Sequence, residues 1–279
     1  MAAPLPRTPG ARLRIGAVTY LNTVPLVRGL AELLPGARLS FDHPSRLADD
    51  LAGGRLDLAL APVIELARHP DWAMVSNACI AARGPVLSVK LLFRRRPAEV
   101  QTLAIDQGSR TSAVLARILL ADIHAVHPRV VQLGVDEAPH ACPADAVLVI
   151  GDRAIRTPET GFIESWDLAD RWRRWTELPF VFAVWAARPG VDVAGVGGAL
   201  EAARDAGRRD LPQIAAEQSA AMGLPLELVL AYLRDHLHFH FGSDERRGLE
   251  LYFERAAALG LTTADHAAAT GPTNELALR

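Results

Sequence analysis

The stretch RIGAVTYLNTVPL, residues 14–26, begins as an apolar run typical of a buried strand and continues into an apolar pattern of helical spacing. Thr23, followed by Pro25, marks where that helix should begin. The first N–H groups of a helix have no acceptor inside the helix. Tyr20, Asn22 and Thr23 therefore stand where a ligand with acceptor atoms could bind, between a strand end and a helix start.

Strand and helix signals alternate on both sides of this stretch, a rhythm typical of α/β proteins with parallel sheets. The predicted strands span residues 13–18, 38–44, 56–62, 72–82, 86–95, 102–106, 129–134, 145–152 and 180–188. The predicted helices span residues 24–36, 45–54, 109–123, 164–179, 193–207, 211–223, 224–237 and 244–260. After Thr262 an alanine-rich tail is expected to be partly disordered.

The pattern restarts after Pro97, which predicts two α/β lobes and a helical C-terminal region. Residues 1–95 and 180–279 are expected to form the first, discontinuous lobe, and residues 96–179 the second. Segments 86–95 and 180–188 are expected to cross between them. Ligands of such folds bind in the cleft between the lobes, at the carboxyl ends of strands.

Composition narrows the class of function. The chain has 279 residues, of which 22% are charged, and a formal net charge of -2 with Lys and Arg scattered, so no nucleic-acid partner is expected. The first 18 residues contain three prolines and three arginines instead of the apolar core of about 7–15 residues that a secretory signal needs. No apolar stretch approaches the roughly 18 residues of a membrane span. We therefore expect a cytoplasmic protein that does not bind membranes.

Neither metal nor cofactor is expected. Cys79 and Cys142 lie far apart, without metal-type or disulfide spacing, and are predicted to be small buried residues. His236, His238 and His240 alternate but have no fourth ligand nearby. The expected partner is a small molecule, and the sequence leaves the oligomeric state open.

Further polar residues occur at the predicted cleft. The segment GSRTS, residues 108–112, follows a strand and opens a helix, so its N–H groups and hydroxyls could hold a carboxylate. Ser109 could instead be only a helix cap. Ser88 interrupts an apolar strand, so it either faces the cleft or is a hydrogen-bonded core hydroxyl. Asn22 could be an ordinary turn residue, and Asp152 could order a donor or cap the next turn.

Six fragments resemble, in order, the chorismate dehydratases of the futalosine route to menaquinone, over residues 13 to about 260. They are GAVTYLNTVPL, GPVLSVKLLF, LAIDQGSRTSAVLARILL, VLVIGDRAI, LPFVFAVWAAR and GLELYFERAAALGL. The resemblance implies a two-lobed fold like type II periplasmic binding proteins, with the ligand cleft between the lobes. It also implies a lyase that removes water from chorismate to form 3-[(1-carboxyvinyl)oxy]benzoate.

The resemblance implies roles for individual residues. Asn22 and Ser88 are expected to be catalytic. The residues expected to bind substrate are Tyr20, Thr23, Ser109, Arg110, Thr111, Ser112 and Asp152. Two alternatives stay open: a non-catalytic small-anion binding protein of the solute-binding type, and the related 1,4-dihydroxy-6-naphthoate synthase. The synthases have a Ser-Pro-Cys-Pro-Asn-Asp type of stretch where this chain has Tyr20 to Thr23, which favours the dehydratase.

Overall fold

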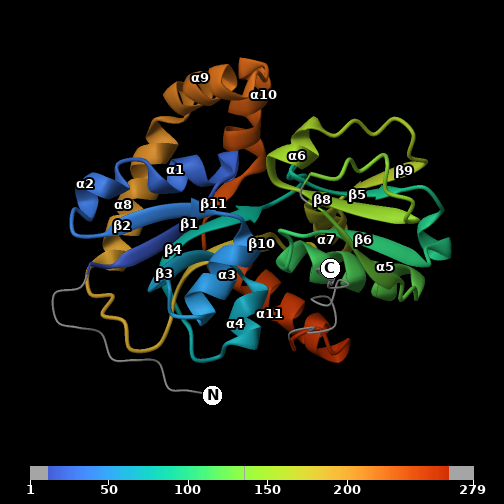
Figure 1. Cartoon of the computed structure of the whole chain (residues 1–279), viewed down its shortest axis with the longest axis horizontal. Coiled ribbons are helices and arrows are strands. Elements are labelled where there is room, and N and C mark those ends of the chain that lie inside the picture. Colours follow the sequence, from blue (N-terminus) through green and yellow to red (C-terminus); the bar gives the residue numbers. More distant parts are fainter. Residues whose placement is uncertain (1–11, 135, 264–279) are drawn as a thin grey trace, which may run out of the picture.

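The computed structural model describes residues 12–134 and 136–263, and it consists of two sheets that lie side by side in Figure 1. The expectations for the extreme N-terminus and for the alanine-rich tail lie largely outside the described residues. The six-stranded sheet of the first lobe has the order β11-β4-β10-β3-β1-β2. The five-stranded sheet of the second lobe has the order β7-β6-β8-β5-β9.

The central strands of both sheets are buried, whereas the edge strands are more exposed. The first sheet contains β1 (Arg14–Val18), β2 (Arg38–Asp42), β3 (Leu58–Pro62), β4 (Ala73–Ala82), β10 (Phe180–Ala187) and β11 (His238–His240). The second contains β5 (Val89–Phe93), β6 (Thr102–Asp106), β7 (Arg129–Leu133), β8 (Ala146–Ile150) and β9 (Glu164–Asp167). Strand β1 runs parallel to β2 and β3, and β6 runs parallel to β7 and β8. The carboxyl ends of β1, β3, β6 and β8 therefore supply the residues at the junction of the lobes.

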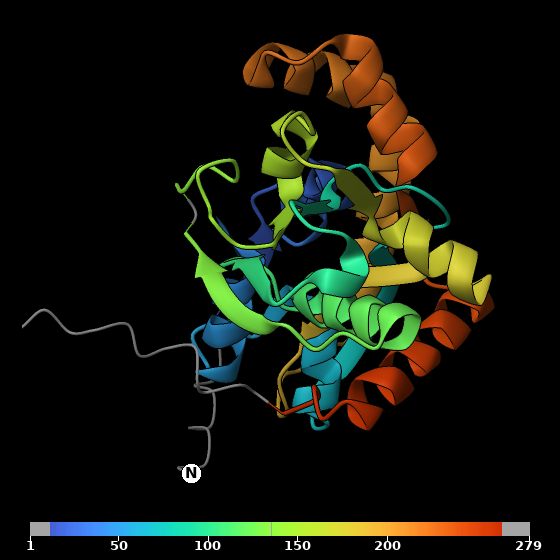
Figure 2. The same cartoon turned by 90° about the vertical axis from the view of Figure 1, so that its right-hand side faces the viewer.

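Helices cover the sheets and form most of the C-terminal region. They are α1 (Val24–Val27), α2 (Leu30–Leu33), α3 (Pro44–Ala52), α4 (Ile64–Arg68), α5 (Thr111–His124), α6 (Gly151–Arg156), α7 (Leu168–Thr176), α8 (Val196–Arg209), α9 (Leu211–Met222), α10 (Leu226–Ala231) and α11 (Ser243–Ala258). Figure 2 shows α9 and α10 standing above the rest of the molecule. There Arg156 of α6 donates to the carbonyl of Met222 at 2.5 Å, which links the end of α9 to the second lobe.

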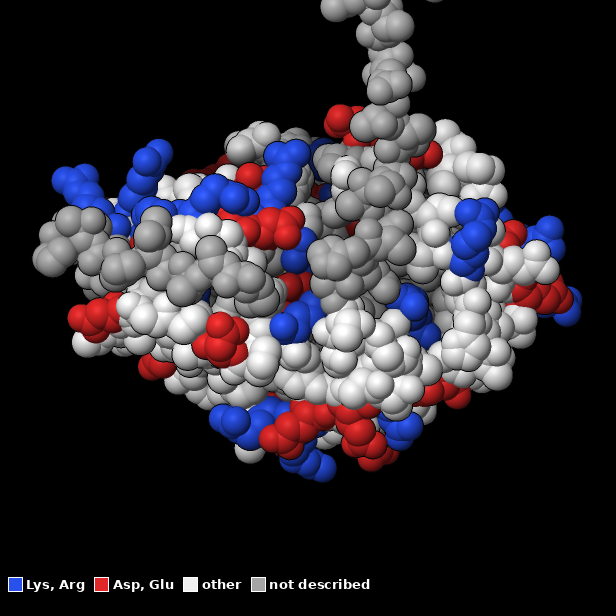
Figure 3. Space-filling view, turned by 60° about the horizontal axis from the view of Figure 1, so that its bottom comes forward, with Lys and Arg blue, Asp and Glu red and all other residues white. Residues whose placement is uncertain are grey.

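Over most of the face in Figure 3, basic side chains lie beside acidic ones. Among the residues that the structure describes, we find no helix that is both long and apolar enough to cross a bilayer. Cys79 and Cys142 are free thiols and both are buried, as predicted.

Two predicted helices differ from the structure. The helix predicted over residues 24–36 is interrupted at Gly29, whose φ of +72° ends α1 before α2 begins. The helix predicted over residues 164–179 begins only at Leu168, because residues 164–167 form β9 and pair with β5. The hydrogen bonds between residues 164–167 and β5 therefore outweigh the helical spacing that predicted a helix start at residue 164.

The crossings between the lobes also differ from the expected segments. Strand β5 pairs with β8 and β9, so it belongs to the sheet of the second lobe. The first crossing therefore precedes Val89 and runs through residues 83–88, so the boundary expected at residue 95 is too late. Strand β10 pairs with β3 and β4 along its length, which leaves residues 177–179 as the second crossing. Gly248 of α11 lies so close to this crossing that a Cβ there would approach the Pro179 oxygen to 2.2 Å.

Asp57 joins three strands at the end of the first sheet that lies away from the second lobe. Its fully buried carboxylate accepts from Arg14 Nη2 and from Arg188 Nη2, each at 2.8 Å, and also from the Arg14 backbone N–H at 3.0 Å. Burial alone would raise the pKa of Asp57, but these hydrogen bonds outweigh it and hold the pKa well below its ordinary value. The ion cluster therefore fixes the starts of β1 and β3 against the end of β10.

Asp57→Asn should lower the unfolding free energy by about 2–3 kcal/mol, since two arginines lose their charged acceptor. Because the folded pKa of Asp57 is depressed, its stabilisation is present above roughly pH 4 and is lost as the pH falls toward the folded pKa. Urea denaturation should show a large gap between wild type and variant at pH 7 and a smaller one in acid. Asp50→Asn, which alters the exposed pair with Arg55, should cost about 0.5 kcal/mol or less. Equal losses in the two variants would contradict the assignment.

Candidate active site

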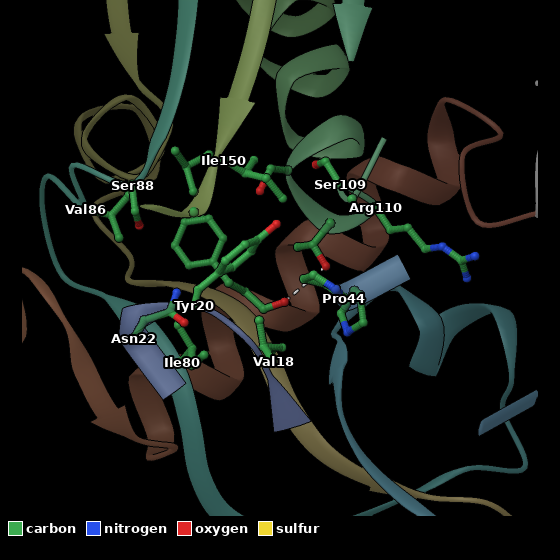
Figure 4. A pocket seen from close by; sticks show the side chains of 18 residues that line it. Val18, Tyr20, Asn22, Pro44, Ile80, Val86, Ser88, Ser109, Arg110 and Ile150 are labelled. Atoms are coloured by element: carbon green, nitrogen blue, oxygen red, sulfur yellow. Dashed lines mark hydrogen bonds between the residues drawn. The ribbon is translucent and has the colours of Figure 1, made fainter. Parts of the chain in front are cut away.

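A cavity of about 540 Å³, including its mouth, lies between the lobes. Its apolar wall contains Val18, Ile80, Val86, Val89, Ile150 and Phe182, and its polar wall contains Tyr20, Asn22, Ser88, Ser109, Arg110, Thr111 and Ser112 (Figure 4). All of these polar residues were predicted as site residues. The structure brings them together, and their individual roles stay predictions.

Tyr20 projects from the end of β1 between the two lobes. Its ring lies directly against Gly151, where a Cβ would come within 2.7 Å of the ring, and its hydroxyl lies 3.3 Å from His43 Nδ1. Burial, aided by the negative charges of Asp106 and Asp152, raises the pKa of Tyr20 far above its ordinary value. The phenol is therefore a protonated hydrogen-bond donor at neutral pH.

Asn22 belongs to a short 3-10 turn (Leu21–Thr23) between β1 and α1, and it is 9% exposed. Its Oδ1 atom accepts from the Thr23 hydroxyl at 3.4 Å. Because this contact uses the side-chain oxygen, it does not occupy the amide N–H groups of Asn22. A single amide side chain can both donate and accept, which suits it to orient a hydroxyl group.

An unusual turn presents Ser88 at the end of the first crossing. The Ser88 N–H donates to the carbonyl of Val86 at 2.7 Å, and Leu87 between them has a φ of +61°, a left-handed value that is costly for a branched residue. The carboxylate of Asp167 accepts from the N–H groups of Val86 at 2.8 Å and Leu87 at 2.7 Å. Asp167, which the sequence analysis missed, thus stabilises the strained turn that brings Ser88 to the wall.

The start of α5 forms a donor-rich part of the wall. The preceding turn is closed by Asp106, whose Oδ1 atom accepts from the Gly108 N–H at 3.1 Å. The hydroxyl of Ser109 is buried without a hydrogen-bond partner among the described residues. Ser112 lies in the first turn of α5, whose N–H groups lack acceptors inside the helix. Together with the helix dipole, these donors form a site suited to a carboxylate.

Arg110 and Thr111 are engaged with the opposite lobe. Arg110 pairs with Asp49 at 2.6 Å and with Glu65 at 3.3 Å, and its guanidinium extends away from Tyr20 in Figure 4. The Thr111 hydroxyl donates to the carbonyl of Phe182 at 3.1 Å. Both residues therefore hold the lobes together in this arrangement.

Thr23 and Asp152 do not lie on the cavity wall. Thr23 is almost fully buried, and its hydroxyl contacts only Asn22 among the hydrogen bonds of the described residues. The Asp152 carboxylate accepts from the Leu21 N–H at 3.0 and 3.3 Å. Any effect of these two residues on a ligand must pass through the neighbouring Asn22 or the turn that contains it.

No carboxylate, imidazole, thiol or ammonium group occurs among the described residues that line the cavity. The three alternating histidines have other contacts: His236 with the Pro85 carbonyl, His238 with Glu245 and His240 with Arg204. Within residues 12–134 and 136–263, no three or more His, Cys, Asp or Glu side chains are grouped as a metal site. The cavity can thus bind and orient an anion with neutral donors.

Comparison with known proteins identifies the family. The profile of a family described as menaquinone biosynthesis matches residues 13–258. The chain belongs to this family. A chorismate dehydratase of Thermus thermophilus is 31% identical over 265 residues, which cover 88% of this chain and 95% of that protein. The resemblance noted in the sequence is thereby confirmed.

Solved structures confirm the two-lobed fold of this family member. A protein from Archaeoglobus fulgidus superposes with a TM-score of 0.76 at 15% identity, covering 91% of this chain and 100% of that one. The alkanesulfonate-binding protein SsuA of Xanthomonas axonopodis pv. citri, bound to MOPS, has a TM-score of 0.64 at 18% identity, covering 95% of this chain and 96% of that one. The α/β architecture of periplasmic binding proteins is therefore present, as expected.

Gly151→Ala should destabilise the protein by about 2–4 kcal/mol, since a left-handed backbone (φ +65°) and overpacking against Tyr20 both cost free energy. Gly223→Ala is the matched control, because Gly223 has a φ of +63° with no atom within 4 Å of the added Cβ. It should cost about 1 kcal/mol. In a Tyr20→Ala background the cost of Gly151→Ala should fall to the control value. Urea unfolding of the four variants measures this, and an unchanged cost without the Tyr20 ring would refute the contact.

Proposed function

We propose that this chain dehydrates chorismate to 3-[(1-carboxyvinyl)oxy]benzoate in menaquinone biosynthesis. The family match and the Thermus thermophilus relative named chorismate dehydratase support the proposal. Chorismate carries two carboxylates and a ring hydroxyl that must leave. A suitable site needs anion-binding donors and a group that assists the departing oxygen.

The observation that carries the proposal is the composition of the cavity wall. It combines the N-terminus of α5 with Ser109, Ser112, Asn22 and Ser88, and among the described residues no carboxylate, imidazole, thiol or ammonium group lies on it. Loss of water from chorismate creates an aromatic ring, so the reaction is favourable without a strong electrophile. Positioning of the reacting groups is then the main catalytic task.

The missing base leads to a substrate-assisted mechanism. The enolpyruvyl carboxylate of chorismate removes the ring proton, and the electron pair of that C–H bond enters the ring. The C–O bond to the ring hydroxyl breaks, and the departing hydroxide takes the same proton back from the enolpyruvyl carboxylic acid, so that water leaves and the product keeps both carboxylates ionised. Asn22 and Ser88 donate hydrogen bonds to that oxygen while its negative charge develops.

A second candidate function is binding without catalysis. It is favoured by the superposition on the alkanesulfonate-binding protein, since that fold serves transport proteins as well. The related 1,4-dihydroxy-6-naphthoate synthase is less well supported, because the relative that covers most of the chain is named a chorismate dehydratase. We further propose a cytoplasmic protein that acts on a small molecule and requires no metal.

Incubating the purified protein with chorismate should produce an aromatic product, followed by ultraviolet absorbance and identified by mass spectrometry. The rate should be unchanged after treatment with EDTA, since no lining residue is a typical metal ligand. Binding of chorismate without any product would support the binding protein and refute the enzyme. A rate abolished by EDTA and restored by a divalent cation would refute the metal-free mechanism.

Asn22→Asp should lower kcat by roughly a hundredfold, about 2.7 kcal/mol of barrier. The change replaces an amide donor with a carboxylate that repels the dianionic substrate. Asn77→Asp makes the same replacement outside the cavity, where Arg204 contacts the side-chain oxygen at 2.5 Å, and should leave kcat nearly unchanged. Steady-state rates of the two variants, normalised to folded protein, test this. Full activity of Asn22→Asp would show that Asn22 is only a turn residue.

A further inference from the structure

Tyr232 is buried beside the candidate active site although it is distant in the sequence. It is 1% exposed and begins a single π-helical turn (Tyr232–His236) that directly continues α10. Isolated π-helical turns are rare and occur frequently at functional sites. Tyr232 is the first side chain of this turn, so its contacts bear on function.

The hydroxyl of Tyr232 lies next to two residues of the cavity wall. The side chains of Ser88 and Asn22 are its hydrogen-bonding neighbours, but neither contact has the geometry of a complete hydrogen bond, so the buried hydroxyl has no well-formed partner among the described residues. Hydrogen bonds in an active site without substrate are often long or misaligned and shorten when the substrate binds. The arrangement fits a contact that forms fully in the complex.

Packing alone does not account for this hydroxyl. A buried hydroxyl without a partner destabilises the folded state, and phenylalanine would fill nearly the same space without that cost. Burial also raises the pKa of Tyr232 well above its ordinary value, with smaller contributions from the charges of Asp152 and Asp167. The phenol therefore acts as a hydrogen-bond donor and not as a base at neutral pH.

We propose that Tyr232 is a positioning residue whose hydroxyl donates to the Ser88 oxygen in the substrate complex and directs the Ser88 O–H toward the departing oxygen. The inference rests on the proposed dehydration. Ser88 Oγ can accept one hydrogen bond while donating another. Tyr232 thus acts through Ser88, and Asn22 completes the set of donors around the departing oxygen.

The test is Tyr232→Phe, assayed with chorismate. We expect kcat to fall about 10-fold or more with KM changed less than about threefold, because the hydrogen bond strengthens mainly in the transition state. The urea midpoint should stay the same or rise, since the lost hydroxyl had no complete partner. A purely structural tyrosine would not give this combination.

Tyr252→Phe is the matched control. Tyr252 is equally buried, but its hydroxyl makes a complete hydrogen bond of 3.0 Å to the Thr111 carbonyl. This variant should have a lower urea midpoint, since a satisfied hydrogen bond is lost, and a kcat within about threefold of wild type.

A double-mutant cycle shows whether Tyr232 acts through Ser88. In a Ser88→Ala background, Tyr232→Phe should reduce kcat by less than about twofold, since the intermediary is already absent. Additive effects of the two substitutions, or a Tyr232→Phe variant with the kcat of wild type, would overturn the role of Tyr232. The proposed function would stand in both cases, provided that the wild-type protein forms the aromatic product. If wild-type protein forms no aromatic product, the proposed function and this inference both fail.

Discussion

The hydrogen bond from the Leu21 N–H to the Asp152 carboxylate is the contact on which the candidate site depends. It joins the residues after β1 to those after β8, which belong to different sheets. The bond satisfies an N–H that a short turn leaves free and a carboxylate that burial makes costly to ionise. It also places Gly151 against the Tyr20 ring, where only a residue without Cβ fits. The shape of the cavity follows from this approach of two strand ends.

The neutral donors proposed to hold an anion also suit the proposed elimination. In that proposal, donors at the start of α5 compensate the negative charge of the substrate without a permanent countercharge, because Arg110 is paired with Asp49 and Glu65. A dianionic substrate then keeps its carboxylates basic enough to accept a proton. Arginine pairs directed into the cavity would bind such a substrate more strongly but lower the basicity of its carboxylates. Weakly polar donors are therefore compatible with a base supplied by the substrate itself.

Local patterns in the sequence predicted those features that depend on local spacing. The apolar run before Tyr20 and the serines after Asp106 identified two strand ends, and both lie at the cavity. Contacts between distant segments were not predictable in this way: the orientation of Thr23 toward the interior and the pairing of Arg110 with the opposite lobe depend on how two sheets approach. The turn at Leu87 was missed for the same reason. Nothing in the sequence VLSV indicates a positive φ at Leu87. The hydrogen bond that stabilises this turn is accepted by Asp167, which is distant in the sequence. The interruption of the helix at Gly29 could have been predicted from the sequence, because glycine often ends helices.

The position of β10 has a consequence for synthesis of the chain. Strands β3 and β4 are consecutive in the sequence, yet in the sheet they are separated by β10, to which both of them pair. A nascent chain that ends before Phe180 therefore lacks the strand that joins β4 to the group formed by β1, β2 and β3. The edges of β3 and β4 that face β10 in the finished sheet are then unpaired. The second lobe has all its strands between Val89 and Asp167 and can form from contiguous chain. Translation thus completes the second lobe before the first, and the exposed edges of β3 and β4 need protection until β10 leaves the ribosome.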